Sequence, residues 1–218
     1  ALDAYKNHTN PIIYPDVDWV DVLLKPFALQ QQHNLNVSGG TKTTKYFVSF
    51  GFLDQNGIYN QPDIEGLDFS INPRYKRYNL RANFDVNLTK NLVMNFKMGN
   101  ILTDSNYPRF STTNLFDMLL RTNPWGTPGI IGDKIVTAYS NDPMEGRRSF
   151  ANPFNELVQE GFQKVNTSTY NLNLGFKYSL DYLIKGLSVR GMYAYDDYYS
   201  HTVQRPKTIP TYTIVVDE

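Results

Sequence analysis

The sequence predicts an all-β protein, a portion of an antiparallel, up-and-down transmembrane β-barrel with about six or seven strands. Six stretches alternate apolar and polar residues with a period of two, the pattern of an extended strand with one apolar and one polar face. Several of them reach the roughly 9–11 residues that a tilted membrane strand needs. The connections between them alternate short and long, as in barrels with short turns on one side of the membrane and long loops on the other.

The composition narrows the function classes. The chain has 218 residues, with 21 basic and 21 acidic side chains. Its net charge is therefore zero, and it lacks the excess of positive charge that is typical of nucleic-acid-binding proteins. It has no cysteine, which excludes disulfides and thiol catalysis. The 16 tyrosines and 13 phenylalanines favour strands. No apolar run has the roughly 20 residues of a membrane-spanning helix, and the first ten residues do not read as a signal peptide.

The clearest strand candidate is residues 77–88, RYNLRANFDVNL. Every odd-numbered position in it is polar and every even-numbered position is apolar, so one face is predicted to be wet and the other apolar. Together, the strands are expected near residues 33–39, 45–53, 75–88, 92–100, 168–180 and 187–199.

Short turns are expected at 40–44, 89–91 and 181–186, and long loops at 54–74 and 101–166. Residues 1–31 are expected to lead into the barrel portion, 32–218. The longer loop is predicted to be partly helical. One helix is expected at 114–122, behind Asn114 as N-cap, and another at 152–161, with Asn152 as cap, Pro153 in the first turn and Gly161 as stop.

No catalytic or metal site is expected. His8, His33 and His201 are far apart in the sequence and lack metal-ligand spacing. Asp196 and Asp197 are adjacent on a predicted strand, so they point to opposite faces and cannot act as a carboxylate pair. No phosphate loop, nucleophile elbow or dinucleotide fingerprint is present. The chain is therefore predicted not to be an enzyme and to need no cofactor.

The polar strand faces are the main candidate surface. On the barrel hypothesis they would line a lumen, and the residues expected there are Arg77, Asn79, Arg81, Asn83, Asp85, Asn95, Lys97, Asn171, Asn173, Lys177 and Arg190. Tyr107, Phe110 and Trp125 are expected in the long loop, where they could contact a substrate or partner or hold the loop's own small core. A soluble all-β carbohydrate-binding module, such as a sandwich, stays open as the alternative.

Several stretches in order resemble the SusC/RagA family of TonB-dependent outer-membrane transporters of Bacteroidetes. These stretches are YPDVDWVDVLLK (14–25), QHNLNVSGGTKTTKYFVSFGFLDQNGIY (32–59), YKRYNLRANFDVNLTKNL (75–92), NPFNELVQEGF (152–162) and YDDYYSHTVQRPKTIPTY (195–212). Together they extend over nearly the whole chain, at positions corresponding to the early barrel strands of the family.

The resemblance implies a nutrient importer of the bacterial outer membrane, taking up glycans, oligosaccharides or peptides. Its members carry a plug domain and a TonB box, and work beneath a SusD-like surface lipoprotein. We expect this chain to be part of such a transporter, without the plug. The implied partners are the plug and other strands of the same transporter, the lipoprotein, TonB and the lipid bilayer. The loop 101–166 is then the candidate for contact with the lipoprotein or the substrate.

Overall fold

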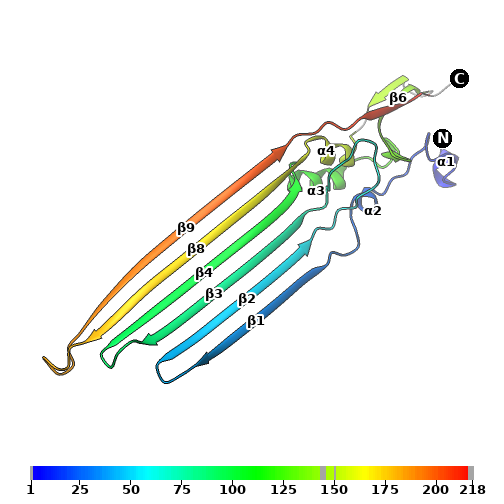
Figure 1. Ribbon diagram of the computed structural model, residues 1–218. Helices are drawn as coiled ribbons and strands as arrows, with labels where there is room; N and C mark the ends of the chain where they lie inside the picture. Colours follow the sequence, from blue (N-terminus) through cyan, green and yellow to red (C-terminus); the bar gives the residue numbers. More distant parts are fainter. Residues whose placement is uncertain (1, 143–145, 150, 216–218) are drawn as a thin grey trace.

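The structure is a computed structural model that describes residues 2–142, 146–149 and 151–215. It has two parts: a long six-stranded sheet, and a group of helices and short strands at one end of that sheet, which we call the cap (Figure 1). The cap comprises residues 2–29, 57–73, 109–161 and 206–215, as far as they are described.

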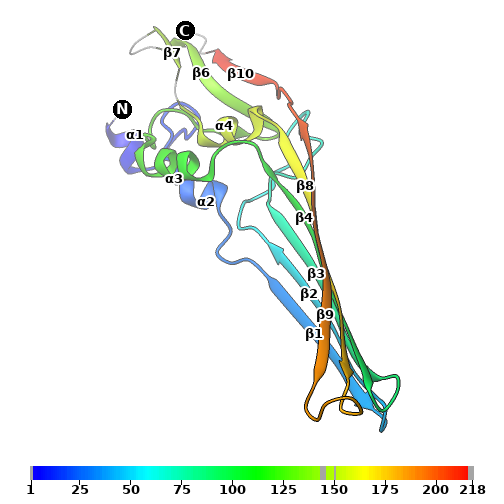
Figure 2. The ribbon, with the colours of Figure 1, turned by 90° about the vertical axis from the view of Figure 1, so that its left-hand side faces the viewer.

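The sheet is an antiparallel meander in which each strand pairs with the next strand of the sheet along the chain. Its order is β1-β2-β3-β4-β8-β9. The strands are β1 (Gln30–Gly40), β2 (Thr44–Asn56), β3 (Arg74–Asn87), β4 (Leu92–Pro108), β8 (Phe162–Ser179) and β9 (Ser188–Arg205). Within the described residues, no second sheet packs on either face of this sheet, so the alternative of a two-sheet sandwich is not what forms (Figures 1 and 2).

All six strands appear in the predicted order, and all except β3 are longer than predicted. β4 continues to Pro108 and β8 begins at Phe162, so the long connection runs from 109 to 161 rather than from 101 to 166. The backbone ladder continues through Thr103 opposite Thr167 and Ser105 opposite Val165. Polar residues occupy both faces of β4 there, which removes the alternation without breaking the hydrogen bonds.

The three short connections lie together at the end of the sheet away from the cap (Figure 1). In two of them a threonine hydroxyl holds the turn: Thr41 Oγ1 accepts from the amides of Thr43 and Thr44, and Thr89 Oγ1 accepts from those of Asn91 and Leu92. In the third, the Asp181 carboxylate accepts from the amide of Gly186, whose φ of 85° suits glycine.

The cap contains four short helices and a second, small sheet. The helices are α1 (Leu2–Lys6), α2 (Trp19–Leu23), α3 (Thr112–Arg121) and α4 (Pro153–Gln159). The small sheet has the order β10-β6-β5, with β7 pairing β6 and β10 parallel to β6. Its strands are β5 (Ile130–Ile131), β6 (Lys134–Asp142), β7 (Gly146–Ser149) and β10 (Thr211–Val215). None of these helices has the length and apolar character needed to cross a membrane, as far as the chain is described.

Helix capping explains where α3 and α4 begin. Asn152 caps α4 as predicted, because its Oδ1 accepts from the amides of Phe154 and Asn155. The prediction that Asn114 caps α3 is wrong. Ser111 is the N-cap, and its hydroxyl accepts from the amide of Asn114, so the helix begins one turn earlier.

One apolar core holds the cap together. Its buried residues come from several separate segments of the chain: Trp19, Leu23, Tyr59, Ile64, Phe69, Ile71, Leu115, Leu119, Ile135, Phe154, Leu157, Val158 and Ile209. Gly161 follows α4 with a φ of 74°, and a Cβ there would collide with the carbonyl oxygen of Arg205, so glycine lets the two segments meet.

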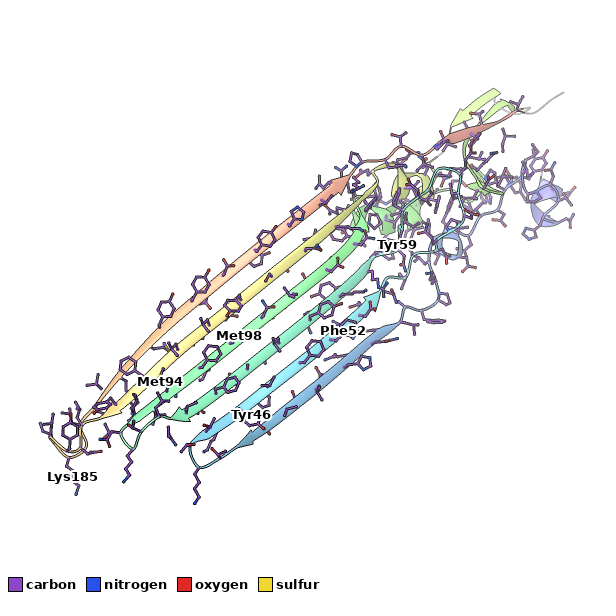
Figure 3. The ribbon with its side chains drawn as sticks, viewed as in Figure 1. Tyr46, Phe52, Tyr59, Met94, Met98 and Lys185 are labelled. Atoms are coloured by element: carbon purple, nitrogen blue, oxygen red, sulfur yellow. The ribbon has the colours of Figure 1, made fainter. Side chains whose placement is uncertain are left out.

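The cap leans over one face of the sheet. The labelled side chains of Tyr46, Phe52, Met94 and Met98 point toward the viewer in Figure 3. After the quarter turn to Figure 2, that face looks to the right and the helices lie to the left (Figure 2). The helices therefore lie over the end of the opposite face, which carries the odd-numbered, polar positions of β3 and β4.

Candidate functional site

The strand register gathers the predicted polar residues on one face of the sheet, which we call the polar face. Arg81 on β3 lies opposite Gly99 on β4, and Gly99 lies opposite Asn171 on β8. Lys177 lies opposite Arg190 on β9. The same alternation places all eleven on this face: Arg77, Asn79, Arg81, Asn83, Asp85, Asn95, Lys97, Asn171, Asn173, Lys177 and Arg190. Whether this face lines a lumen stays a prediction.

Cross-strand hydrogen bonds order some of these side chains. Asn171 Nδ2 donates to Asp196 Oδ1 over 2.6 Å, and Asn95 Nδ2 donates to Asp85 Oδ1 over 3.4 Å. A Cβ on Gly175 would lie 2.5 Å from Asn95 Oδ1, so glycine at this position leaves room for the large amide beside it.

A small hollow of about 90 Å³ lies on the polar face around Gly51, and its lining includes Asn34, Arg77 and Asn79. The side-chain oxygen of Asn79 is buried and has no hydrogen-bond partner among the described residues.

The opposite face, which we call the apolar face, exposes large apolar side chains. These side chains point away from the sheet, and no other strand or helix of the described residues packs against them (Figure 3). The exposed members are Leu35, Val37, Tyr46, Phe50, Tyr78, Leu80, Leu102, Leu174, Phe176, Val189, Tyr193, Tyr195 and Tyr199. So large an exposed apolar area is rare on soluble monomers and marks a surface that something apolar covers.

The height of this apolar band matches a membrane. On β4 it runs from Leu92 to Leu102, and at ~3.3 Å per residue with the usual strand tilt it is about 25 Å tall. Residues paired across the strands form rows, and the two rows of the band that lie nearest the cap mix aromatic side chains (Phe52, Tyr78 and Tyr170) with polar ones, as at a membrane–water interface. The next row toward the cap, just outside the band, contains charged residues, among them Lys76 opposite Asp104.

The three predicted loop aromatics have different surroundings. Tyr107 is not in a loop: it belongs to β4, opposite Gln163, because β4 is longer than predicted. Phe110 is partly buried against the core of the cap, so it helps to hold the loop's own core, the alternative to contact with a substrate or partner. Trp125 is 57% exposed, with Tyr5 6.2 Å away between ring centroids. Of the three, Trp125 is the one that offers an open surface to a partner.

Ion pairs on the cap tie its distant segments together. Glu65 accepts from Lys134 Nζ over 2.8 Å and from the hydroxyl of Tyr212, so these donors lower the pKa of the Glu65 carboxyl. Lys207 Nζ lies 2.7 Å from Asp68 Oδ2 and lowers the pKa of that carboxyl. Both contacts connect the segment before β3 to later parts of the chain.

In the described part of the chain, no group of three or more histidine and acidic side chains could hold a metal ion. Asp197 lies opposite Tyr170, on the apolar face, whereas Asp196 lies opposite Asn171 on the polar face. The two carboxylates therefore diverge as predicted.

Sequence reasoning missed one feature, a hollow of about 550 Å³ where the apolar face meets the cap. Lys76 and Lys164 line it from even-numbered strand positions. The alternation in β3 could have pointed to Lys76, because a charge at an apolar-face position indicates that the apolar band has ended.

Comparison with known proteins agrees with this geometry. No protein-family model matches the chain. Over 89 residues, 41% of the chain, it is 27% identical to TonB-dependent receptor P26 of Formosa agariphila, and covers 8% of that relative. This similarity, together with the likeness to the solved structures described next, confirms the resemblance to TonB-dependent transporters that the sequence motifs indicated.

The fold also matches solved structures. For the RagAB peptide transporter the TM-score is 0.59 at 21% identity, over 86% of this chain and 19% of that one. For the RagAB peptide importer in its closed-closed and open-open states the TM-score is 0.61 at 20% identity, over 93% and 92% of this chain and 22% of each solved chain. The predicted fold class, part of an antiparallel transmembrane β-barrel, is confirmed, and the chain spans about a fifth of the solved chains.

Proposed function

We propose that this chain forms part of the barrel wall of a TonB-dependent outer-membrane importer that takes up peptides or glycans with a SusD-like surface lipoprotein. The observation that carries the proposal is the single-layer sheet with an exposed apolar face about 25 Å tall and a polar opposite face. Similarity to a TonB-dependent receptor and the fold of the RagAB peptide transporter support the same function.

In this function the apolar face contacts lipid and the polar face lines the lumen around a plug. The exposed side chains of Arg77 and Arg81 offer hydrogen bonds to plug residues, water or passing solute. β1 and β9 each pair with one neighbour among the described residues, and an open strand edge is costly in lipid. Further strands of the transporter would satisfy those edges, and TonB would act through the plug.

The cap then lies at the extracellular mouth, because long loops of such barrels face outside and short turns face the periplasm. It leans over the polar face, so it narrows the vestibule above the lumen (Figure 2). Its exposed Trp125 is our candidate for contact with the lipoprotein or the imported molecule.

Single-cysteine scanning of β3 in the intact transporter would test the face assignment, since this part of the transporter has no cysteine of its own. Cysteine replaces Leu80, Arg81, Ala82 and Asn83 in turn, and spin labels at each site are probed in membranes with lipid-soluble and water-soluble relaxation agents. Labels at 80 and 82 should respond to the lipid-soluble agent, and labels at 81 and 83 to the water-soluble one. Equal responses at all four sites would exclude a wall with one lipid face.

Uptake by cells tests transport itself. Cells that express the intact transporter and its lipoprotein should accumulate fluorescent oligopeptides or oligosaccharides, and cells without the transporter should not. Which of the two classes accumulates identifies the substrate class, and uptake of neither by the expressing cells would overturn the proposal.

A further inference from the structure

The hollow of about 550 Å³ lies just beyond the apolar band, on the same face of the sheet. Lys76 and Tyr78 are two residues apart on β3, so their side chains share that face, as do those of Asp104 and Leu102 on β4. The hollow therefore begins one strand row beyond the last aromatic row, on the side of the cap.

The segment of the cap before β3 closes the hollow from above, whereas the helices of the cap lie over the opposite face of the sheet. Phe69 stacks on Phe162 with 5.0 Å between the ring centroids and 23° between the planes. Asn106 Nδ2 donates to the carbonyl oxygen of Ser70 over 3.5 Å. These contacts fix residues 68–70 over the ends of β4 and β8, so the hollow has a floor of strands and an aromatic wall.

The hollow and an adjoining one of about 530 Å³ share Asp68 and Phe162 and are rich in cations. Their lining includes the basic residues Arg74, Lys76, Lys164, Arg205 and Lys207, and the acidic residues Asp68 and Asp104.

Some of these charges are already paired within the protein. Arg74 pairs with Asp54 over 2.7 Å, and Lys207 pairs with Asp68. Lys76 lies between Asp54 on β2 and Asp104 on β4 but forms no direct ion pair with either, because Asp54 pairs with Arg74. Lys164 lies opposite Asn106 and likewise forms no ion pair with a described residue. Both ammonium groups can therefore still donate to an anion, Lys164 without a carboxylate opposite it and Lys76 in competition with Asp54 and Asp104. Both side chains lie on the face of the sheet that carries the apolar band.

Polar acceptors in the hollow suit hydroxyl groups. The side-chain oxygen of Asn106 is buried and has no hydrogen-bond partner among the described residues. The Asp104 carboxylate and the Ser70 hydroxyl also line the hollow, and the Phe69–Phe162 pair offers an aromatic surface to a sugar ring. Cations for phosphate, acceptors for hydroxyls and an aromatic wall together fit a phosphorylated saccharide.

We propose that this hollow binds the phosphorylated saccharide headgroup of a membrane glycolipid, whose acyl chains lie on the apolar band below it. The proposal rests on the membrane orientation of the proposed function. The continuity of the hollow with the apolar band favours a lipid over a soluble sugar phosphate, because the acyl chains and the headgroup of one molecule would contact adjoining surfaces of the protein.

The test is native mass spectrometry of the intact transporter, extracted from its own outer membrane, with bound lipids counted per transporter. The double variant Lys76→Ala/Lys164→Ala should retain phosphorylated glycolipid at least about tenfold less well than the unaltered protein, since it loses two charge-assisted contacts. The control Lys42→Ala/Lys90→Ala removes the same charge at the opposite end of the sheet and should retain the glycolipid normally. Lys76→Arg/Lys164→Arg should restore most of the retention.

Equal retention by the double variant and the control would overturn the proposal, and so would retention of phospholipid in place of glycolipid. Displacement of the bound species by millimolar inorganic phosphate or glucose 6-phosphate would indicate a soluble ligand and overturn it as well. Uptake of the fluorescent substrate is measured on the same cells. Normal uptake with unchanged lipid retention refutes only this inference, whereas absence of uptake in the unaltered transporter refutes the proposed function.

Discussion

Phe154 in the cap and Phe176 on β8 are the same residue type in opposite surroundings. Phe154 is 0% exposed in a core built from several segments, whereas Phe176 is 44% exposed on the apolar face of the sheet. The cap thus folds as a water-soluble domain does, with its apolar side chains inside. The sheet leaves its apolar side chains outside, an arrangement that suits contact with lipid, as the proposed function requires. In the proposed function, one chain is therefore exposed to both lipid and water, and the boundary between the two lies within a few residues of Lys76.

The largest expected effect is on the core of the cap. Phe154→Ala should lower the free energy of unfolding of the cap by about 3–5 kcal/mol, because it removes a fully buried ring. Hydrogen exchange of the amides of α4 in the intact transporter measures this. The matched variant Phe176→Ala should leave exchange in α4 unchanged, and faster exchange in both variants would show that the two regions are not independent.

The sheet is tested by a charge at the middle of the apolar band. Phe84→Arg places a guanidinium between Tyr46 and Phe96 on the apolar face, and in the membrane of the proposed function it should cost about 2–4 kcal/mol. Asn83→Arg puts the same group on the polar face, where it stays hydrated, and should cost much less. Urea unfolding of the transporter in lipid vesicles gives both values, and equal costs would contradict the assignment of the two faces.

A smaller effect compares two asparagines. Asn152 caps α4 and also donates to the carbonyl oxygens of Gly129 and Val136, all in the buried cap. Asn152→Ala should cost about 2 kcal/mol, from the lost cap and the buried acceptors left without a donor. Asn171→Ala on the polar face loses the bond to Asp196 where water can replace it, and should cost less than about 1 kcal/mol. Thermal unfolding of the two variants checks the order.

The smallest effect is electrostatic and lies on the surface of the cap. Lys134 and Tyr212 lower the pKa of Glu65 below its usual value. The contact therefore stabilises the cap above the ordinary pKa of a glutamate, and this contribution is lost as the pH falls through the lower pKa of the folded state. Hydrogen exchange in β10 should quicken over that acidic range, and Glu65→Gln should remove this pH dependence. An unchanged pH profile in the variant would show that Glu65 does not tether β10.

The strands could be predicted because their signal is local. Alternation in 77–88 assigns each side chain to a face without knowledge of the rest of the protein, and the register confirms that grouping across β3, β4, β8 and β9. The extension of β4 to Pro108 escaped prediction because Asp104 and Ser105 are both polar, so neither face carries a hydrophobic signal there.

The cap could not be assembled from the sequence, because its contacts join residues far apart in the chain. Gln159, for example, exchanges two hydrogen bonds with the backbone of Ile209, fifty residues away. The cation-rich hollow was missed for the same reason, since Phe69 and Phe162 meet only after the segment before β3 folds over the ends of β4 and β8. Local periodicity carries no information about such contacts.

The meander order described above also bears on how such a protein can change over generations. The long connections 57–73 and 109–161 and the segment after Arg205 all leave the sheet at the same end, whereas the three short turns lie at the other. An insertion or replacement in a long connection leaves the pairing of each strand with its neighbours in register. In the transporter that we propose, the cap could therefore change its binding specificity independently of the sheet, whose strand pairing and apolar band would stay the same.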